Sequence, residues 1–119
     1  MSLELCDLIL KVPAIYLGQK TIHHIRHPDM DESMEFKRRF SELRTHGNRI
    51  RSDNQIEAVN WYYNKLAQRV EGLTWKGQDL MDAFPDGDWK KRVPFEIKDV
   101  VVGYLRAQVD LEEEEEKNS

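Results

Sequence analysis

Three histidines near the start of the chain are the side chains most suited to bind a metal ion. His23, His24 and His27 lie close to Asp29, and Cys6 lies upstream. On a strand, His23 and His27 would share one face while His24 would point away, and their spacing matches no established zinc pattern. We therefore expect half-exposed strand histidines, no metal site and no cofactor.

Other residues that could carry out catalysis lack partners along the chain. The single cysteine, Cys6, has no evident activating neighbour, so we interpret it as a small hydrophobic residue. The segment Pro85-Asp86-Gly87-Asp88 is typical of a turn and lacks the remaining ligands of a calcium loop. The chain has no glycine-rich phosphate loop, nucleophile elbow or HExxH motif. We expect no catalytic residue and no enzymatic activity.

A basic stretch from Lys37 to Arg51 is the candidate for contact with nucleic acid. Its net charge of +5 could pair with phosphates. However, the whole chain carries −4, no recognition-helix pattern stands out, and the bases follow an acidic helix start, which the helix dipole favours. A solvated helix end is therefore the other interpretation. The six bases are Lys37, Arg38, Arg39, Arg44, Arg49 and Arg51.

Three tryptophans, Trp61, Trp75 and Trp89, are candidate partner-binding residues. Tryptophan is common among the side chains that dominate binding energy at protein interfaces. Trp61 lies opposite the apolar stripe of its expected helix, among polar neighbours. Packing beneath another part of the chain accounts for Trp61 equally well, and for Trp75 and Trp89 local packing is the simpler interpretation.

The hydropathy pattern places these residues on a hairpin and several helices. Alternation around Leu8 to Val12 predicts a first strand, and a turn at Gly18-Gln19 leads to a second strand from about Lys20 to Arg26. A helix should follow Pro28, because Asp29 and Glu32 resemble a capping box.

Two further helices are expected downstream. One opens with Ser52 and Gln55 as a capping box, carries a continuous apolar stripe from Ile56 to Val70 and ends at Gly72. Residues 73–92 are irregular, with a short helix over 78–84. The last helix begins near Pro94. Its apolar positions are Ile97, Val100, Val101, Tyr104 and Leu105.

The length of 119 residues fits one domain. No apolar run approaches the roughly 20 residues that span a bilayer, and one cysteine suits a reducing compartment. Residues 110–119 carry −5, whereas residues 1–109 carry +1. We expect an α+β fold, mostly α. It would comprise an N-terminal β-hairpin and about three amphipathic helices in a single domain over 1–109, followed by a disordered, flexible acidic tail over 110–119.

The order of these parts resembles the small tail-assembly chaperones of long-tailed bacteriophages. The resemblance covers most of residues 5–109. It depends on the strand pair, the helix opened after His27-Pro28-Asp29, the second helix ending in Val70-Glu71-Gly72-Leu73, and Val93-Pro94-Phe95-Glu96-Ile97-Lys98 before the final helix. At the C-terminus, Glu116-Lys117-Asn118 can be encoded GAA-AAA-AAC, which contains a slippery heptamer. Genes of this family commonly end near such a ribosomal frameshift site.

The resemblance implies a non-catalytic role in virion assembly. Members of the family act in the host-cell cytoplasm, bind the tape-measure protein and help recruit tail-tube subunits, and self-association along the partner is implied. A frameshifted longer product would contact the tube subunit. The alternative is a small nucleic-acid-binding regulatory protein that uses the segment Lys37 to Arg51; otherwise we expect neither nucleic acid nor a membrane as a partner.

Overall fold

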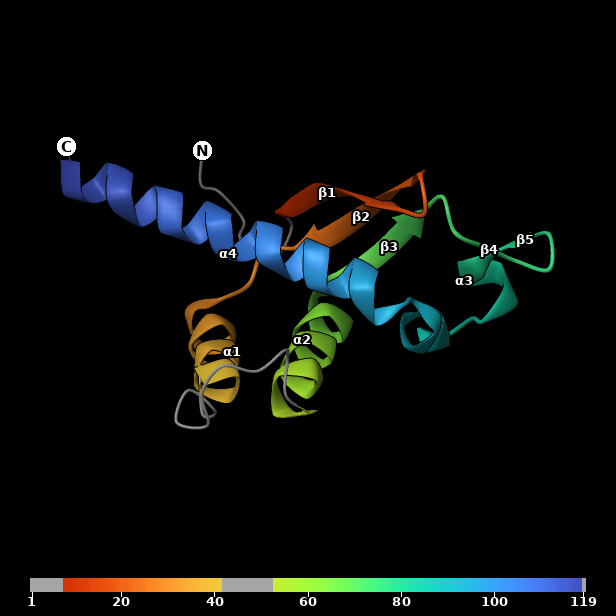
Figure 1. The fold of residues 1–119 in the computed structure, drawn as a ribbon, viewed down its shortest axis with the longest axis horizontal. Coiled ribbons are helices and arrows are strands. Elements are labelled where there is room, and N and C mark those ends of the chain that lie inside the picture. Colours follow the sequence, from red (N-terminus) through yellow and green to blue (C-terminus); the bar gives the residue numbers. More distant parts are fainter. Residues whose placement is uncertain (1–7, 42–52, 119) are drawn as a thin grey trace.

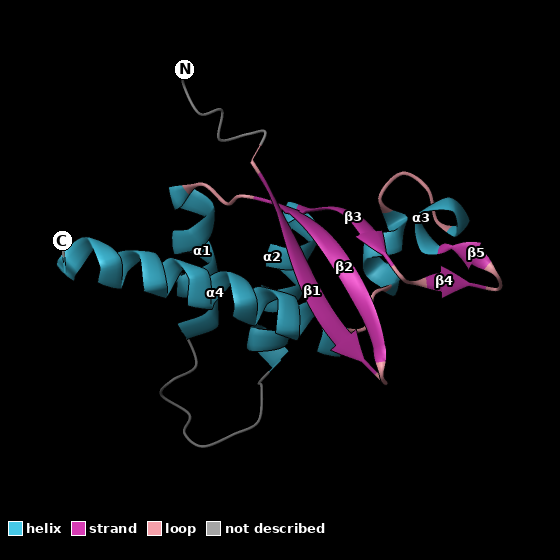
Figure 2. Ribbon diagram, turned by 90° about the horizontal axis from the view of Figure 1, so that it is seen from above, coloured by secondary structure: helices cyan, strands magenta, loops and turns pink. Residues whose placement is uncertain are grey.

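The computed structural model describes residues 8–41 and 53–118. Its centre is a three-stranded antiparallel sheet of β1 (Ile9–Tyr16), β2 (Gln19–Arg26) and β3 (Ala67–Glu71), in the order β1-β2-β3. The helices α2 (Asp53–Leu66) and α4 (Phe95–Asn118) pack against one face of this sheet. Figure 2, seen from above, shows β1 and β2 lying over α4 and α2.

The predicted hairpin is confirmed, but its turn lies one residue earlier than expected. β1 and β2 pair in continuous register from Ile9 opposite Arg26 to Tyr16 opposite Gln19. The two linking residues, Leu17 and Gly18, both have positive φ, at 52° and 79°. A two-residue turn with this backbone matches the twist of the strands. Leu17 is therefore held in a conformation that a branched side chain rarely adopts.

The second helix is shorter than the sequence predicts, and the expectation of a mostly α fold with only one hairpin is wrong. The chain leaves α2 at Leu66 and enters β3 at the next residue. Ala67 and Val70 continue the apolar stripe of the helix, yet both are buried in the sheet instead. Pairing with β2 satisfies the backbone groups of this segment. At Gly72, a Cβ would lie 2.8 Å from the carbonyl oxygen of Lys20, so only glycine fits beside β2.

A small lobe follows the sheet and replaces the irregular segment expected over 73–92. It contains β4 (Thr74–Trp75), β5 (Gln78–Asp79), α3 (Leu80–Ala83) and the 3-10 helix η3 (Asp88–Arg92). β4 and β5 form a second, two-stranded antiparallel sheet. Figure 1 shows the lobe at one side of the molecule, where α4 begins. The described residues thus form four α-helices and one 3-10 helix around two sheets.

The last helix is longer than expected. α4 continues from Phe95 to Asn118, so the prediction of a disordered tail over 110–119 is wrong for the backbone of residues 110–118. Glutamate is a good helix former, which makes the run Glu112–Glu116 compatible with a helix. In both ribbon views the C-terminal half of α4 extends past α1 (Met30–Ser41), beyond the body of the molecule (Figures 1 and 2).

A buried hydrogen-bond chain joins β1, β2 and α2 at the centre of the core. Thr21 Oγ1 donates to the carbonyl of Ala14 at 3.1 Å. That hydroxyl has one hydrogen, so it must accept from His23 Nε2, 2.8 Å away. His23 Nδ1 is then the acceptor for the Tyr63 hydroxyl at 2.7 Å. The network therefore selects the neutral Nε2–H tautomer, and His23 is fully buried.

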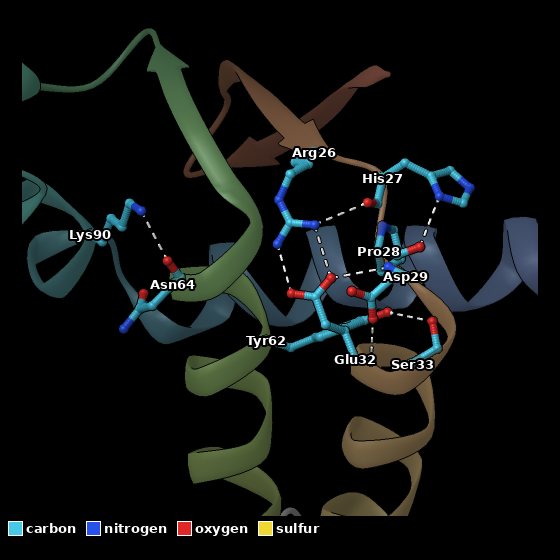
Figure 3. A network of polar contacts seen from close by, with 9 residues as sticks. All are labelled: Arg26, His27, Pro28, Asp29, Glu32, Ser33, Tyr62, Asn64 and Lys90. Carbon is cyan, nitrogen blue, oxygen red and sulfur yellow. Dashed lines mark hydrogen bonds and ion pairs between the residues drawn. The ribbon is translucent and has the colours of Figure 1, made fainter. Parts of the chain in front are cut away.

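A second network fixes the start of α1 against the end of β2 (Figure 3). The guanidinium of Arg26 donates to both carboxylate oxygens of Glu32, at 2.9 and 2.6 Å. The amide of Glu32 donates to Asp29 Oδ1 and the amide of Asp29 donates to Glu32 Oε1, which confirms the predicted capping box. The Arg26 hydrogen bonds lower the pKa of the Glu32 carboxyl to about 2. The predicted cap at Ser52 lies outside the described residues.

The strained turn generates a first prediction. Leu17 is 89 % exposed and contributes no packing that a polar residue would remove. Asparagine tolerates positive φ far better, and Asn-Gly is the preferred pair for this turn. Leu17→Asn should raise the free energy of unfolding by about 1 kcal/mol, measured by urea denaturation. A loss of stability would show that the exposed leucine makes a contact the chain needs.

The buried histidine generates a second prediction. Burial, together with the charge of His24, lowers the pKa of His23 from 6.5 to about 4. Between pH 6.5 and about 4, His23 of the unfolded chain binds a proton that His23 of the native chain does not bind. The stability contributed by the neutral histidine is therefore fully present above pH 6.5 and is lost as the pH falls toward 4. The expected loss is up to about 3 kcal/mol. His23→Gln should flatten the measured free energy of unfolding over this range; an unchanged slope would contradict the assignment.

Candidate interaction surface

Trp61 is a residue of α2 whose ring faces α1 and is partly buried against the core. The guanidinium carbon of Arg39 stands 4.4 Å from the centre of the Trp61 ring, and Lys65 Nζ lies 5.5 Å from it. Beside it, Tyr62 stacks on Phe36 of α1 with ring centres 4.4 Å apart. Trp61 lies opposite the main apolar stripe of α2 because it packs toward the neighbouring helix α1. It therefore contributes to packing within the chain.

Trp89 is a core residue. It lies in η3 and is only 5 % exposed. The next residue, Lys90, donates from Nζ to the carbonyl of Asn64 at 3.0 Å, which places a cation on one of the last carbonyls of α2. These contacts anchor η3 to the body, and local packing accounts for Trp89.

Trp75 is the exposed tryptophan of the three, and it belongs to a cluster that we call the Trp75 cluster: Trp75, Phe84 and Arg92. The Trp75 and Phe84 rings meet edge to face with centres 5.2 Å apart. The guanidinium carbon of Arg92 lies 4.6 Å from the centre of the Phe84 ring and 5.8 Å from that of Trp75. Trp75 remains 43 % exposed. A cation and two aromatic rings therefore share one exposed surface.

The backbone of the lobe brings these three residues together. The β4–β5 hairpin returns the chain to α3, where the amide of Leu80 donates to the carbonyl of Leu73 at 3.0 Å. Asp79 Oδ1 caps α3 by accepting from the amide of Met81. The amide of Trp89 donates to the carbonyl of Phe84 at 3.2 Å, which sets η3 and its last residue, Arg92, beside Phe84. No local sequence pattern indicates that Trp75, Phe84 and Arg92 lie together, because turns separate these residues along the chain.

A surface cavity of about 330 Å³ adjoins the cluster. Its lining residues are Phe84, Asp88, Lys91 and Arg92. Two cations, one carboxylate and an aromatic ring favour a ligand that presents a negative group next to an apolar one, as an acidic peptide segment does. Of the residues in the Trp75 cluster, the sequence pattern indicated only Trp75 as a candidate binding residue and did not indicate Phe84 or Arg92. The two lysines directly before Arg92 could have indicated a basic binding surface.

The predicted basic segment is only partly described. Lys37, Arg38 and Arg39 lie on α1, whereas Arg44, Arg49 and Arg51 lie outside the described residues. Arg38 and Arg39 both pair with Glu35. The hydrogen bond from Arg38, and to a smaller extent the one from Arg39, lowers the pKa of the Glu35 carboxyl to about 2. Lys37 is exposed. The charge of this helix end is therefore partly neutralised within α1.

The histidines are separated rather than gathered. The expectation of a half-exposed side chain is wrong for His23. Its side chain is buried because it lies on the face of β2 that points into the core. His24 points to the opposite face, where its Nε2 lies 2.7 Å from Glu71 Oε2. His27 Nδ1 donates to the carbonyl of Pro28. Across residues 8–41 and 53–118 no three His, Cys, Asp or Glu side chains form a potential metal site; Cys6 lies outside these ranges.

The two tryptophan environments generate a third prediction. Trp61→Ala should lower the free energy of unfolding by about 3 kcal/mol, because it removes a partly buried ring and its contact with Arg39 of α1. Trp75→Ala should cost about 1 kcal/mol, because the side chain is largely at the surface. Thermal and urea denaturation of both variants measure the difference. Equal losses would contradict the assignment of Trp61 to packing and Trp75 to the surface.

Comparison with known proteins found no matching family model, no matching curated protein and no matching solved structure. Within the described part of the chain, no helix has both the length and the apolar character needed to cross a bilayer.

Proposed function

We propose that this protein is a non-catalytic tail-assembly chaperone of a long-tailed bacteriophage, acting in the host-cell cytoplasm. It binds the tape-measure protein and helps to recruit tail-tube subunits during virion assembly. The partner's long helices expose apolar surface, so a chaperone for them must present apolar and aromatic side chains of its own.

The observation that carries this proposal is the set of large hydrophobic side chains left exposed around a complete core. On α1, Met30 and Met34 are 77 % and 62 % exposed and lie one helical turn apart. On α4, Val100 and Tyr104 repeat this arrangement at 49 % and 40 %. Methionine suits surfaces that accept varied apolar partners. Such pairs on helices match the surface that helix binding requires.

The Trp75 cluster supports the same function. Its aromatic rings supply contact area, and Arg92 adds a cation beside them, a combination that is common at binding hot spots. The lobe that carries the cluster is anchored to the body by Trp89 and Lys90. A partner therefore meets a surface that is already arranged before binding.

The nucleic-acid-binding alternative predicts a different measurement. A regulator that used Lys37 to Arg51 would bind duplex DNA with an affinity that falls steeply as salt rises. It would lose that binding in the triple variant Arg38→Ala, Arg39→Ala, Arg44→Ala. The proposed chaperone should show neither effect.

The chaperone proposal generates a fourth prediction. Co-expressed with a long helical protein encoded next to its gene, the chain should keep that protein soluble and co-purify with it. The double variant Trp75→Ala, Arg92→Ala should weaken retention at least tenfold, because it removes one aromatic ring and the cation above the other. Lys20→Ala, at an exposed position on the sheet, serves as the matched surface control.

Two results would contradict the chaperone assignment. One is an insoluble partner despite co-expression, and the other is salt-dependent duplex binding by the chain alone. The gene adds an independent check: codons 116–118 should read GAA-AAA-AAC and be followed by an overlapping frame and a very long helical reading frame.

A further inference from the structure

The helix α4 is apolar on two opposite sides. Its inner side buries an apolar row against α2 and the sheet: Ile97, Val101, Val102 and Leu105. Its outer side leaves Val100 49 % and Tyr104 40 % exposed, together with Gly103 and Ala107. We call these four residues, Val100, Gly103, Tyr104 and Ala107, the outer seam. Burial within the chain accounts for the inner side, whereas the outer seam remains exposed at the surface.

The spacing of the outer seam is that of a helix-pairing surface. Val100, Tyr104 and Ala107 are separated by four and then three residues, and Leu111 follows after four more in the sequence. Alternating steps of four and three keep apolar side chains on the line where two helices meet. In Figure 1, α4 crosses the molecule between the three-stranded sheet above and the helices α1 and α2 below. The seam is therefore presented along the most extended element of the fold.

Gly103 adds a second observation at the same place. Glycine weakens a helix interior because it loses more backbone freedom on folding than any other residue. A Cβ built at Gly103 would meet nothing within 4 Å. The folded chain thus gives no steric reason for glycine here. A glycine on the outer seam lets another backbone approach α4 closely, as the pairing of two helices requires.

The charge of α4 decides which helix fits. Residues 95–118 carry eight acidic and three basic side chains, a net charge of −5, and this excess lies entirely in residues 110–118, because residues 95–109 carry two of each sign. Glu96 lies exposed near one end of the seam, and the sequence places Asp110 and Glu112–Glu116 toward the other. Two copies of α4 packed in parallel would bring these acidic runs side by side and repel each other. A helix with Lys and Arg beside its apolar stripe would instead be attracted to the acidic end of α4.

We propose that the outer seam of α4 binds an amphipathic helix of a partner protein whose apolar stripe is flanked by basic residues. The apolar seam supplies the affinity, and the acidic end of α4 attracts and orients the basic helix. The proposal rests on the proposed function for the helical character of the partner, and it adds which face binds and what chemistry the partner helix carries.

The test uses the full chain and two synthetic helical peptides of about three heptads. Both peptides carry Leu at the two seam positions; one carries Lys at the flanking positions and the other carries Glu. Fluorescence anisotropy of labelled peptide gives the dissociation constants. The seam variant is Val100→Gln with Ala107→Gln. The matched control is Ile9→Gln with Ile15→Gln, which makes the same kind of change on the exposed face of β1.

The Lys-flanked peptide should bind the wild-type chain and the Ile9, Ile15 control equally well. The seam variant should bind it at least tenfold more weakly, with an unchanged melting temperature, because both positions are exposed. The Glu-flanked peptide should not bind, and added salt should weaken the Lys-flanked complex.

Three outcomes would overturn the proposal. They are equal binding of both peptides, binding of the Lys-flanked peptide that the seam variant leaves unchanged, and self-association of the chain that the seam variant abolishes. Failure of the chaperone function is separable from failure of the seam. If the peptide binds through the seam while the helical protein encoded beside the gene does not, the proposed function fails and the seam stands.

Discussion

The hydrogen-bond chain from Tyr63 through His23 and Thr21 to the carbonyl of Ala14 is the constraint on which the rest of the structure depends. Each link has a fixed direction, because the single hydrogen of Thr21 is already committed to Ala14. The chain joins α2 to the middle strand and the middle strand to β1. A neutral histidine is required at its centre, since every polar atom of the ring is then satisfied without a buried charge.

Around this centre, further polar contacts set the orientation of the helices. Lys98 of α4 is buried, with its ammonium 5.5 Å from the centre of the Tyr63 ring, and burial lowers its pKa to about 8. Arg26 at the end of β2 holds Glu32 and so fixes the start of α1. Lys90 ties the lobe to the end of α2. The two exposed surfaces, the Trp75 cluster and the outer seam, are carried by elements fastened in this way.

Contacts between neighbours in sequence were predictable, and contacts across the fold were not. The hairpin and the Asp29–Glu32 capping box depend on residues a few positions apart, so their patterns were sufficient. β3 was missed because Ala67 and Val70 satisfy a helical period as well as a strand, and only pairing with β2 decides between them. Among the candidate site residues, Trp75 was identified by its type, while Arg92 became visible only when η3 was placed beside Phe84.

By itself the sequence determined where the first hairpin turns and where a helix begins, the uneven charge along the chain and the apolar residues available for a core. The tertiary structure alone decided which of those residues the core uses. Trp89 is buried and Trp61 packs against the core partly buried, while Trp75 stays exposed; likewise Val102 is buried while Val100 is exposed. The physical reason is that hydrophobic burial has no direction of its own: a helix that is apolar on two sides is oriented by the surfaces it meets.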